Sequence, residues 1–187
     1  MSNFVSKLIS SAAITTVMLG SIALAATADP DVGGAPMYPT KNIVENAVNS
    51  RDHTTLVAAV KAAGLVDTLE SAGPFTVFAP TNKAFEKLPA GTVETLVKPE
   101  NKATLTKILT YHVVPGKLSA ADLMAMVRDG GGQATLKTVE GETLTVKHRG
   151  SHLELIDAKG DVSMITIKDV FQSNGVIHVI NTVLLPG

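Results

Sequence analysis

Residues 73–85 read GPFTVFAPTNKAF, and this stretch determines how the rest of the chain is interpreted. Its first part, FTVFA, is rich in β-branched and aromatic side chains, which predicts a buried strand. Pro80 disfavours a helical conformation in the residue before it, so the chain stays extended up to this point. Thr81 or Asn82 can then cap a short helix that runs through Phe85. We therefore expect a buried strand followed at once by a helix.

Upstream of this strand the pattern is helical. Residues 41–50 and 53–64 place apolar side chains three and four positions apart, as one face of a helix does. Asp52 can cap the second of these helices and Gly64 can end it. Residues 26–40, ATADPDVGGAPMYPT, are rich in proline, glycine and alanine, which predicts a flexible N-terminal lead.

Downstream, the chain changes from helices to strands. Two helical pieces are expected between residues 92 and 110, followed by YHVVPG, which has strand composition and ends in a Pro-Gly turn. Ser119 and Asp122 form a capping-box pattern that opens the apolar helix LMAMV. Beyond the glycines at 130–132, short alternating segments separated by glycine predict a β meander of about five strands. The whole pattern predicts an α+β fold with helices on one side of an antiparallel or mixed sheet.

The beginning of the chain predicts a signal peptide over residues 1–25. Lys7 supplies a positive charge, the run after it is uncharged, and A-x-A sites permit cleavage after Ala25 or Ala28. A membrane anchor is the alternative, because the uncharged run is about as long as a membrane span. We expect an exported protein, periplasmic or secreted, with one domain over residues 41–187 and no membrane span after cleavage.

Composition excludes several classes of function. The chain has no cysteine, although exported proteins meet an oxidising compartment, so thiol catalysis and zinc–thiolate sites are excluded. Sixteen basic and 17 acidic residues give a net charge of −1, without the basic excess that nucleic-acid binding calls for. Tryptophan is absent and aromatic residues make up 4%, which argues against a carbohydrate site built on stacked rings.

Two further motifs have competing interpretations. His148 and His152 flank Gly150 and Ser151, and across a tight hairpin they could form a weak metal site, although a polar hairpin tip is the simpler interpretation. The helix LMAMV, residues 123–127, is either an adaptable methionine-rich binding face or a helix that faces the core. Exposure of its methionines distinguishes the two.

Three segments together resemble the signatures of the fasciclin-like (FAS1) domain. Residues 73–85 resemble its first signature, YHVVPG at 111–116 its Tyr-His motif, and NGVIHVINTVLLP at 174–186 its closing signature. The segments fall in the family's order, and the resemblance extends from about Lys41 to the end of the chain. It implies a β-sheet wedge or sandwich wrapped by N-terminal and central helices.

The resemblance also implies a function. Members of this family mediate adhesion and extracellular protein contacts, and no catalytic activity defines them. We therefore expect a non-enzymatic module without a cofactor. Its partner would be a protein or a cell-surface or matrix component, and it would be a monomer or self-associate weakly. A periplasmic protein that binds a small ligand or metal, and a hydrolase, remain the alternatives.

The resemblance assigns candidate residues to each signature. They are Phe78, Pro80, Thr81, Asn82 and Phe85 as structural residues of the first signature, Tyr111, His112, Val113 and Val114 as an interaction or structural motif, and His178, Val179, Ile180 and Asn181 as structural residues of the closing signature. The family often has aspartate where Asn82 and Asn181 stand. Asparagine keeps the hydrogen-bonding geometry but carries no charge, which argues against a cation site there.

Strand alternation yields specific expectations for the two histidines of these motifs. It places Tyr111 and Val113 on one face and His112 and Val114 on the other. We expect His112 to be a structural pin that hydrogen-bonds the loop around residues 81–82, with recognition as the alternative. His178 lies in an apolar strand, and we expect it on the less buried face or with one hydrogen-bond partner.

Overall fold

The computed structural model describes residues 29–187, so the predicted signal peptide over residues 1–25 lies outside the described residues. Its helices are α1 (Ile43–Ala47), α2 (Thr54–Ala63), α3 (Val66–Glu70), α4 (Asn82–Phe85), α5 (Thr92–Leu96), α6 (Lys102–Tyr111) and α7 (Ala120–Asp129), with short 3-10 turns η1 (Arg51–His53) and η2 (Pro99–Asn101). Its strands are β1 (Phe75–Pro80), β2 (Val113–Pro115), β3 (Gln133–Lys137), β4 (Thr143–Arg149), β5 (His152–Ile156), β6 (Val162–Gln172) and β7 (Gly175–Ile180). Within residues 29–187, none of the helices is long and apolar enough to cross a membrane.

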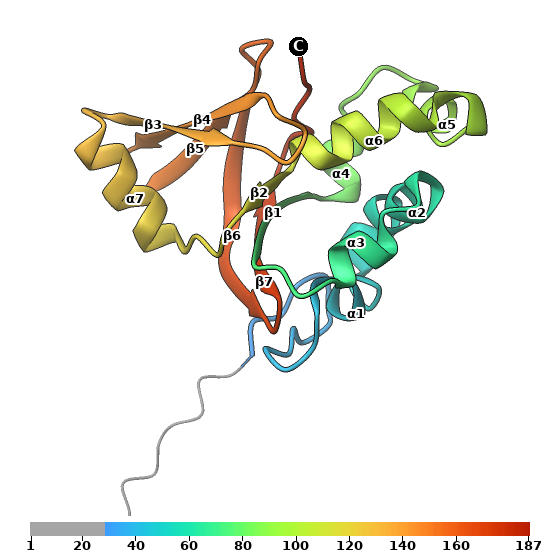
Figure 1. The fold of residues 1–187 in the computed structure, drawn as a ribbon, viewed down its shortest axis with the longest axis horizontal. Coiled ribbons are helices and arrows are strands. Elements are labelled where there is room, and N and C mark those ends of the chain that lie inside the picture. Colours follow the sequence, from blue (N-terminus) through green and yellow to red (C-terminus); the bar gives the residue numbers. More distant parts are fainter. Residues whose placement is uncertain (1–28) are drawn as a thin grey trace, which may run out of the picture.

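The seven strands form one mixed sheet in the order β2-β1-β7-β6-β5-β4-β3. β1 and β7 are parallel, and the other neighbouring strands pair antiparallel. The sheet curls until its two ends approach, where the backbone N–H of Val139 donates to the carbonyl of Val113 at 2.8 Å. Helices α1 to α6 lie together on one side of the sheet (Figure 1). The predicted α+β fold and the five-strand meander, β3 to β7, are confirmed.

Strand β1 is buried on both faces because it separates two apolar cores. Val77 and Ala79 belong to the helix-layer core, between the sheet and helices α1 to α6. Phe78 belongs to the inner core, which the curled sheet encloses. This position explains why FTVFA lacks the alternation of a half-exposed strand.

Helix α7 corrects the expectation that all helices lie on one side of the sheet. It lies apart from the other helices, beside the strands β3, β4 and β5 (Figure 1), and buries Leu123 and Val127 in the inner core. Met124 and Met126 face outward and are 40% and 37% exposed. LMAMV is therefore a helix that faces the core, and its two methionines are exposed on either side of the buried stripe.

Among the predicted helix boundaries, the end of α2 and the start of α7 are confirmed, and the start of α2 is wrong. Gly64 ends α2 in the left-handed region, with φ 71°, and the Ser119–Asp122 capping box opens α7. Asp52, expected to cap α2, instead lies within η1. The first turn of α2 is capped by the side-chain oxygen of Asn82, which comes from a distant segment and could not be read from local sequence.

The N-terminal lead packs against the domain over residues 29–40, although its composition is that of a flexible segment. Val32 and Met37 are 3% and 2% exposed and belong to the helix-layer core. The N–H of Met37 donates to the carbonyl of Pro30 at 2.9 Å, and Gly33 accepts from the N–H of Arg51 at 3.1 Å. Two apolar side chains among turn residues are enough to anchor a segment whose composition predicts flexibility.

This packing predicts that Met37→Ala destabilises the domain by about 2–5 kcal/mol, the usual cost of truncating a buried methionine. The matched control is Met124→Ala, the same change at an exposed site, which should stay within about 0.5 kcal/mol of the parent. Urea unfolding of the chain that begins at residue 29 measures both. Equal effects of the two substitutions would show that the lead does not belong to the core.

Candidate functional site

The Tyr-His segment, residues 111–116, is the end of a helix followed by a short strand. Tyr111 is the last residue of α6, His112 has helical backbone angles, and β2 begins at Val113. The alternation expected for this segment is therefore wrong. Tyr111 and Val114 lie in the inner core, whereas Val113 lies in the helix-layer core. A change from helix to strand within the motif reverses which side chains share a face.

His112 is buried, 3% exposed, and both of its ring nitrogens bond to backbone. Nδ1–H donates to the carbonyl of Ile108 at 2.8 Å, and Nε2 accepts from the N–H of Leu184 at 3.0 Å. Because a carbonyl only accepts and an N–H only donates, these partners determine the tautomer. The expected bond to residues 81–82 is absent, and the histidine instead joins α6 to the segment that follows β7.

Burial keeps this segment uncharged. It lowers the pKa of His112 to about 4, against the opposing effects of the Ile108 carbonyl and the charge of Asp157. It raises the pKa of Tyr111 to about 12. The Tyr111 hydroxyl donates to the carbonyl of Thr143 at 2.8 Å and accepts from the N–H of Ala158 at 3.0 Å. Both side chains therefore hold distant backbone segments together.

His178 lies on the face predicted by alternation, but this face is fully buried. It pairs in register with Phe78, and the two rings stack with centroids 5.8 Å apart. Nε2–H donates to the carbonyl of Leu118 at 2.9 Å, and Nδ1 accepts from the N–H of Asp169 at 3.2 Å. Burial lowers its pKa as well. The expectation of a less buried face is wrong, and two partners replace the one expected.

Asp169 extends this network to the start of α7. Its φ of 59° is unusual for a residue other than glycine, and it lies at the irregular part of the β6–β7 ladder. Its carboxylate accepts from the N–H of Ala120, the first residue of α7, at 2.7 Å. Thus His178 and Asp169 together fix the position of the helix that closes the inner core.

Asn82 has a bridging role that uses both ends of its amide. Its oxygen accepts from the N–H of Thr55 at 3.0 Å and from the hydroxyl of Thr54 at 3.2 Å. Its NH₂ donates to the carbonyl of Arg51 at 2.8 Å, which an aspartate at this position could not do. Thr81, the other predicted cap, accepts from the N–H of Ala84 and begins α4.

Asn181 extends the β6–β7 pairing beyond β7. Its side-chain oxygen accepts from the N–H of Met164 at 2.9 Å. Its backbone carbonyl accepts from the ammonium group of Lys87 at 2.6 Å. Asn82 and Asn181 thus bond to different neighbours, and each has its amide oxygen engaged. The remaining first-signature and closing-signature candidates are placed in the two cores or in the strands between them: Pro80 in β1, Phe85 and Val179 in the helix-layer core, and Ile180 in the inner core.

The candidate metal pair at the β4–β5 hairpin does not assemble. His148 pairs with Leu153, and His152 pairs with Arg149, so the two histidines are one register step apart. Directly opposed residues share a face, and the next residue points to the other face. The two histidines therefore do not form the pair that the metal-binding alternative requires. Within residues 29–187, no group of three or more potential metal ligands occurs.

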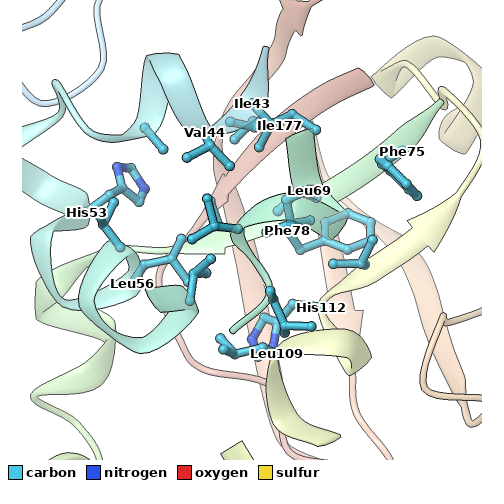
Figure 2. A pocket seen from close by; sticks show the side chains of 18 of the residues that line it. Ile43, Val44, His53, Leu56, Leu69, Phe75, Phe78, Leu109, His112 and Ile177 are labelled. Carbon is cyan, nitrogen blue, oxygen red and sulfur yellow. The ribbon is translucent and has the colours of Figure 1, made fainter. Parts of the chain in front are cut away.

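A cavity of about 80 Å³ lies between the helix layer and the sheet. Its wall is largely apolar and comes from α1, α2, α3, α6, β1 and β7; Figure 2 shows Ile43, Leu56, Leu69, Leu109 and Ile177 around it, with His53 and His112 in the wall. We call it the helix–sheet cavity. Tertiary packing creates it, so no local sequence signal predicts it.

A second hollow, of about 230 Å³, lies on the surface between α7 and the strands β5 and β6. Met124, Leu153 and Ile165 supply its apolar part, and His152 and Lys168 supply polar groups. We call it the α7 hollow. It brings together two sequence candidates, the methionine helix and one of the paired histidines, that had no predicted connection.

The sequence signals also did not single out Asn174 as a structural residue. It is buried, its NH₂ donates to the carbonyls of Leu69 and Ser71, and its oxygen accepts from the N–H of Ile43. It therefore joins α1 and α3 to the β6–β7 turn. The Asn-Gly pair at residues 174–175 signals a hairpin, but that signal describes the backbone and not the distant partners of the side chain.

The fasciclin domain family model matches residues 51–186. The chain therefore belongs to the fasciclin domain family. Protein sll1483 of Synechocystis sp. is 52% identical over 146 residues, which covers 77% of this chain and 73% of the relative. Immunogenic protein MPB70 of Mycobacterium bovis is 39% identical over 145 residues, covering 75% of this chain and 66% of the relative.

Animal relatives and a solved structure agree with this assignment. Transforming growth factor-beta-induced protein ig-h3 of Sus scrofa is 35% identical over 148 residues, which covers 79% of this chain but only 20% of that protein. The FAS1 domain pair from the insect cell adhesion molecule fasciclin I matches with a TM-score of 0.70 and 21% identity, covering 79% of this chain and 51% of that chain. This structural likeness confirms the fold.

The buried histidines predict that the domain loses stability in acid. In the unfolded chain the pKa of a histidine is about 6.5, whereas burial lowers that of His112 to about 4. The unfolded state therefore binds more protons between these values. The contribution of this pKa difference to the free energy of unfolding is about 3 kcal/mol at most. It is fully present above about pH 6.5 and is lost as the pH falls towards 4.

Urea unfolding near pH 7 and near pH 4.5 measures this loss in the parent and in His112→Asn. The substitution removes the acceptor for the N–H of Leu184, which should cost about 1–3 kcal/mol at neutral pH and make the pH dependence shallower. His148→Asn, at an exposed histidine, should match the parent at both pH values. An unchanged pH slope in His112→Asn would contradict the neutral, buried state.

Proposed function

We propose that this chain is an exported, non-enzymatic binding module of the fasciclin type, which acts in adhesion by contacting a protein at the cell surface or in the surrounding matrix. The observation that carries the proposal is the family match over residues 51–186. The matched structure comes from an insect cell adhesion molecule, which supports a role of the same class. Export rests on the predicted signal peptide over residues 1–25.

The hydrogen bonds and burial of His112 and His178 favour a structural role for these histidines over a catalytic one. His112 and His178 use both ring nitrogens for backbone hydrogen bonds, and burial lowers both pKa values. A general base needs a nitrogen within reach of the proton that it abstracts. A histidine whose two nitrogens hold the fold together does not meet this requirement, so the hydrolase alternative gains no support from the motif.

The contact surface that we assign to the partner is the α7 hollow, whose wall includes the exposed side chain of Met124. Met124 lines the hollow and Met126 is exposed on the same helix. Methionine side chains are flexible and polarizable, and they adapt to the shape of a protein partner. His152 and Lys168 supply polar groups at the hollow, as the rim of a protein interface requires.

Proximity labelling in the producing organism tests this proposal. The full chain is fused at its C-terminus, through a linker, to a peroxidase, and labelled proteins are identified for three versions. These are the parent, the double variant Met124→Lys/Met126→Lys, and Val48→Lys, which makes the same chemical change at an exposed site near α1. We expect the parent and Val48→Lys to label the same extracytoplasmic protein and the double variant to lose it.

Two results would contradict the proposal. Equal labelling by all three versions would show that α7 is not the contact surface. Labelling of cytoplasmic proteins would show that the chain is not exported. The N-terminal peptide of the same samples should begin at residue 26 or 29, after cleavage at Ala25 or Ala28. A chain that still begins at Met1 and fractionates with membranes would favour the anchor over the signal peptide.

A further inference from the structure

The α7 hollow has an apolar side and a donor side. The apolar side consists of Met124, Leu153 and Ile165, and the donor side consists of Ser151, His152 and Lys168. The donor-side residues are exposed, and within residues 29–187 their side chains take part in no ion pair and no hydrogen bond of the protein. The remaining wall residue, Thr166, donates its hydroxyl to the carbonyl of Val179 at 3.2 Å. Three side chains of the hollow are thus free to bond a ligand.

The wall of the α7 hollow carries positive charge without a compensating acid. Of the described residues, no Asp or Glu lines it. The acids next to its wall residues in β5 and β6 are engaged elsewhere: Glu154 pairs with Arg149 at 3.2 Å, and the carboxylate of Asp169 accepts from the N–H of Ala120 at 2.7 Å. The ammonium group of Lys168 is therefore available to an anionic group of a ligand.

The two flanks of α7 differ in charge. Residues three or four positions apart share a face of a helix, so the exposed Arg128 lies one turn from Met124, which lines the hollow. On the other flank, Asp122 and Asp129 stand in the same relation to Met126. The flank of α7 that borders the hollow is therefore basic and the opposite flank is acidic, which directs an acidic ligand to the hollow.

The size and the two-sided wall of the hollow favour a peptide over other anions. Its volume of about 230 Å³ exceeds the ~150 Å³ that holds benzene in an engineered apolar cavity, so a carboxylate and an apolar side chain fit together. An inorganic anion would leave the apolar side uncovered, and an acidic polysaccharide has no apolar side chain to place there. A peptide supplies both groups from neighbouring residues.

We propose that the α7 hollow binds an acidic peptide segment of the protein partner, in which an Asp or Glu carboxylate accepts hydrogen bonds from the donor side and a neighbouring apolar side chain covers the apolar side. Lysine only donates hydrogen bonds, and serine and histidine can donate, so all three groups suit a carboxylate. The inference rests on the proposed function, since that function makes the α7 hollow the contact with a protein.

The test titrates the full chain, with ¹³C-labelled methionine methyl groups, with the peptide acetyl-Ser-Glu-Leu-Ser-amide at millimolar concentrations. The methyl signal of Met124 should shift, because this residue lines the hollow. The signals of Met126, on the other flank of α7, and of the buried Met37 should not shift, and the Met37 signal also reports whether a variant keeps its core.

Changes in the peptide and in the chain separate the two sides of the hollow. Replacing the Glu of the peptide by Gln should weaken binding about two- to fivefold, as the loss of an exposed charge pair does, and should abolish its dependence on salt. Replacing the Leu by Ser should weaken binding about tenfold through lost apolar burial. Lys168→Met should match the Gln peptide, whereas Lys137→Met, at an exposed lysine outside the hollow, should match the parent.

Three results would overturn the inference: no shift of the Met124 signal, equal affinity for the Glu and Gln peptides, or a heparin-derived tetrasaccharide or inorganic phosphate that binds as tightly as the Glu peptide. Proximity labelling with Lys168→Glu, and with Lys137→Glu as its control, distinguishes this failure from failure of the proposed function. We expect Lys168→Glu alone to lose the partner. Equal labelling by the parent and Lys168→Glu, with loss in Met124→Lys/Met126→Lys, would keep the proposed function and overturn the acidic segment. A parent that labels no extracytoplasmic protein would overturn both.

Discussion

Strand β1 runs parallel to β7 although the two strands are far apart in the chain, and most other features depend on this pairing. The register from Phe75 with Gly175 to Pro80 with Ile180 makes these strands the shared wall of two cores. One face supports the helix layer and the other faces the interior of the curled sheet. A parallel pair buried on both faces needs apolar side chains at nearly every position, which accounts for the composition of both strands.

The polar residues around this pair mainly bond to backbone. His112 links α6 to the segment after β7, His178 fixes the loop before α7, and Asn174 joins α1 and α3 to the β6–β7 turn. Each of these side chains connects segments that are distant in the chain. The two family signatures and the Tyr-His segment are therefore parts of one packed unit. Its strands bury the apolar surface, and its buried polar groups hydrogen-bond neighbouring segments in fixed positions. Burying such polar groups costs free energy unless each donor and acceptor has a hydrogen-bond partner. In His112, His178 and Asn174, the side-chain donors and acceptors have such partners.

Local sequence predicted the elements of this fold better than it predicted their partners. The strand FTVFA, the capping box at Ser119, the helix end at Gly64 and the strand meander all follow from short-range chemistry, and they are confirmed. The resemblance to the fasciclin domain supplied the fold. The differences arose where a distant segment decides the outcome. Residues 29–40 have the composition of a loop but place two side chains in the core, and the Tyr-His segment changes from helix to strand within one motif. The helix–sheet cavity and the α7 hollow had no sequence signal, because a cavity belongs to the packed whole.

The central claim is that the motif histidines are neutral backbone pins. It is tested most directly by ¹⁵N NMR of the imidazole nitrogens near pH 6. Because their backbone partners differ, the two histidines should be opposite tautomers: His112 with its proton on Nδ1, and His178 with its proton on Nε2. Both rings should be uncharged at this pH, since burial lowers both pKa values. A protonated ring, or the same tautomer at both positions, would contradict the account.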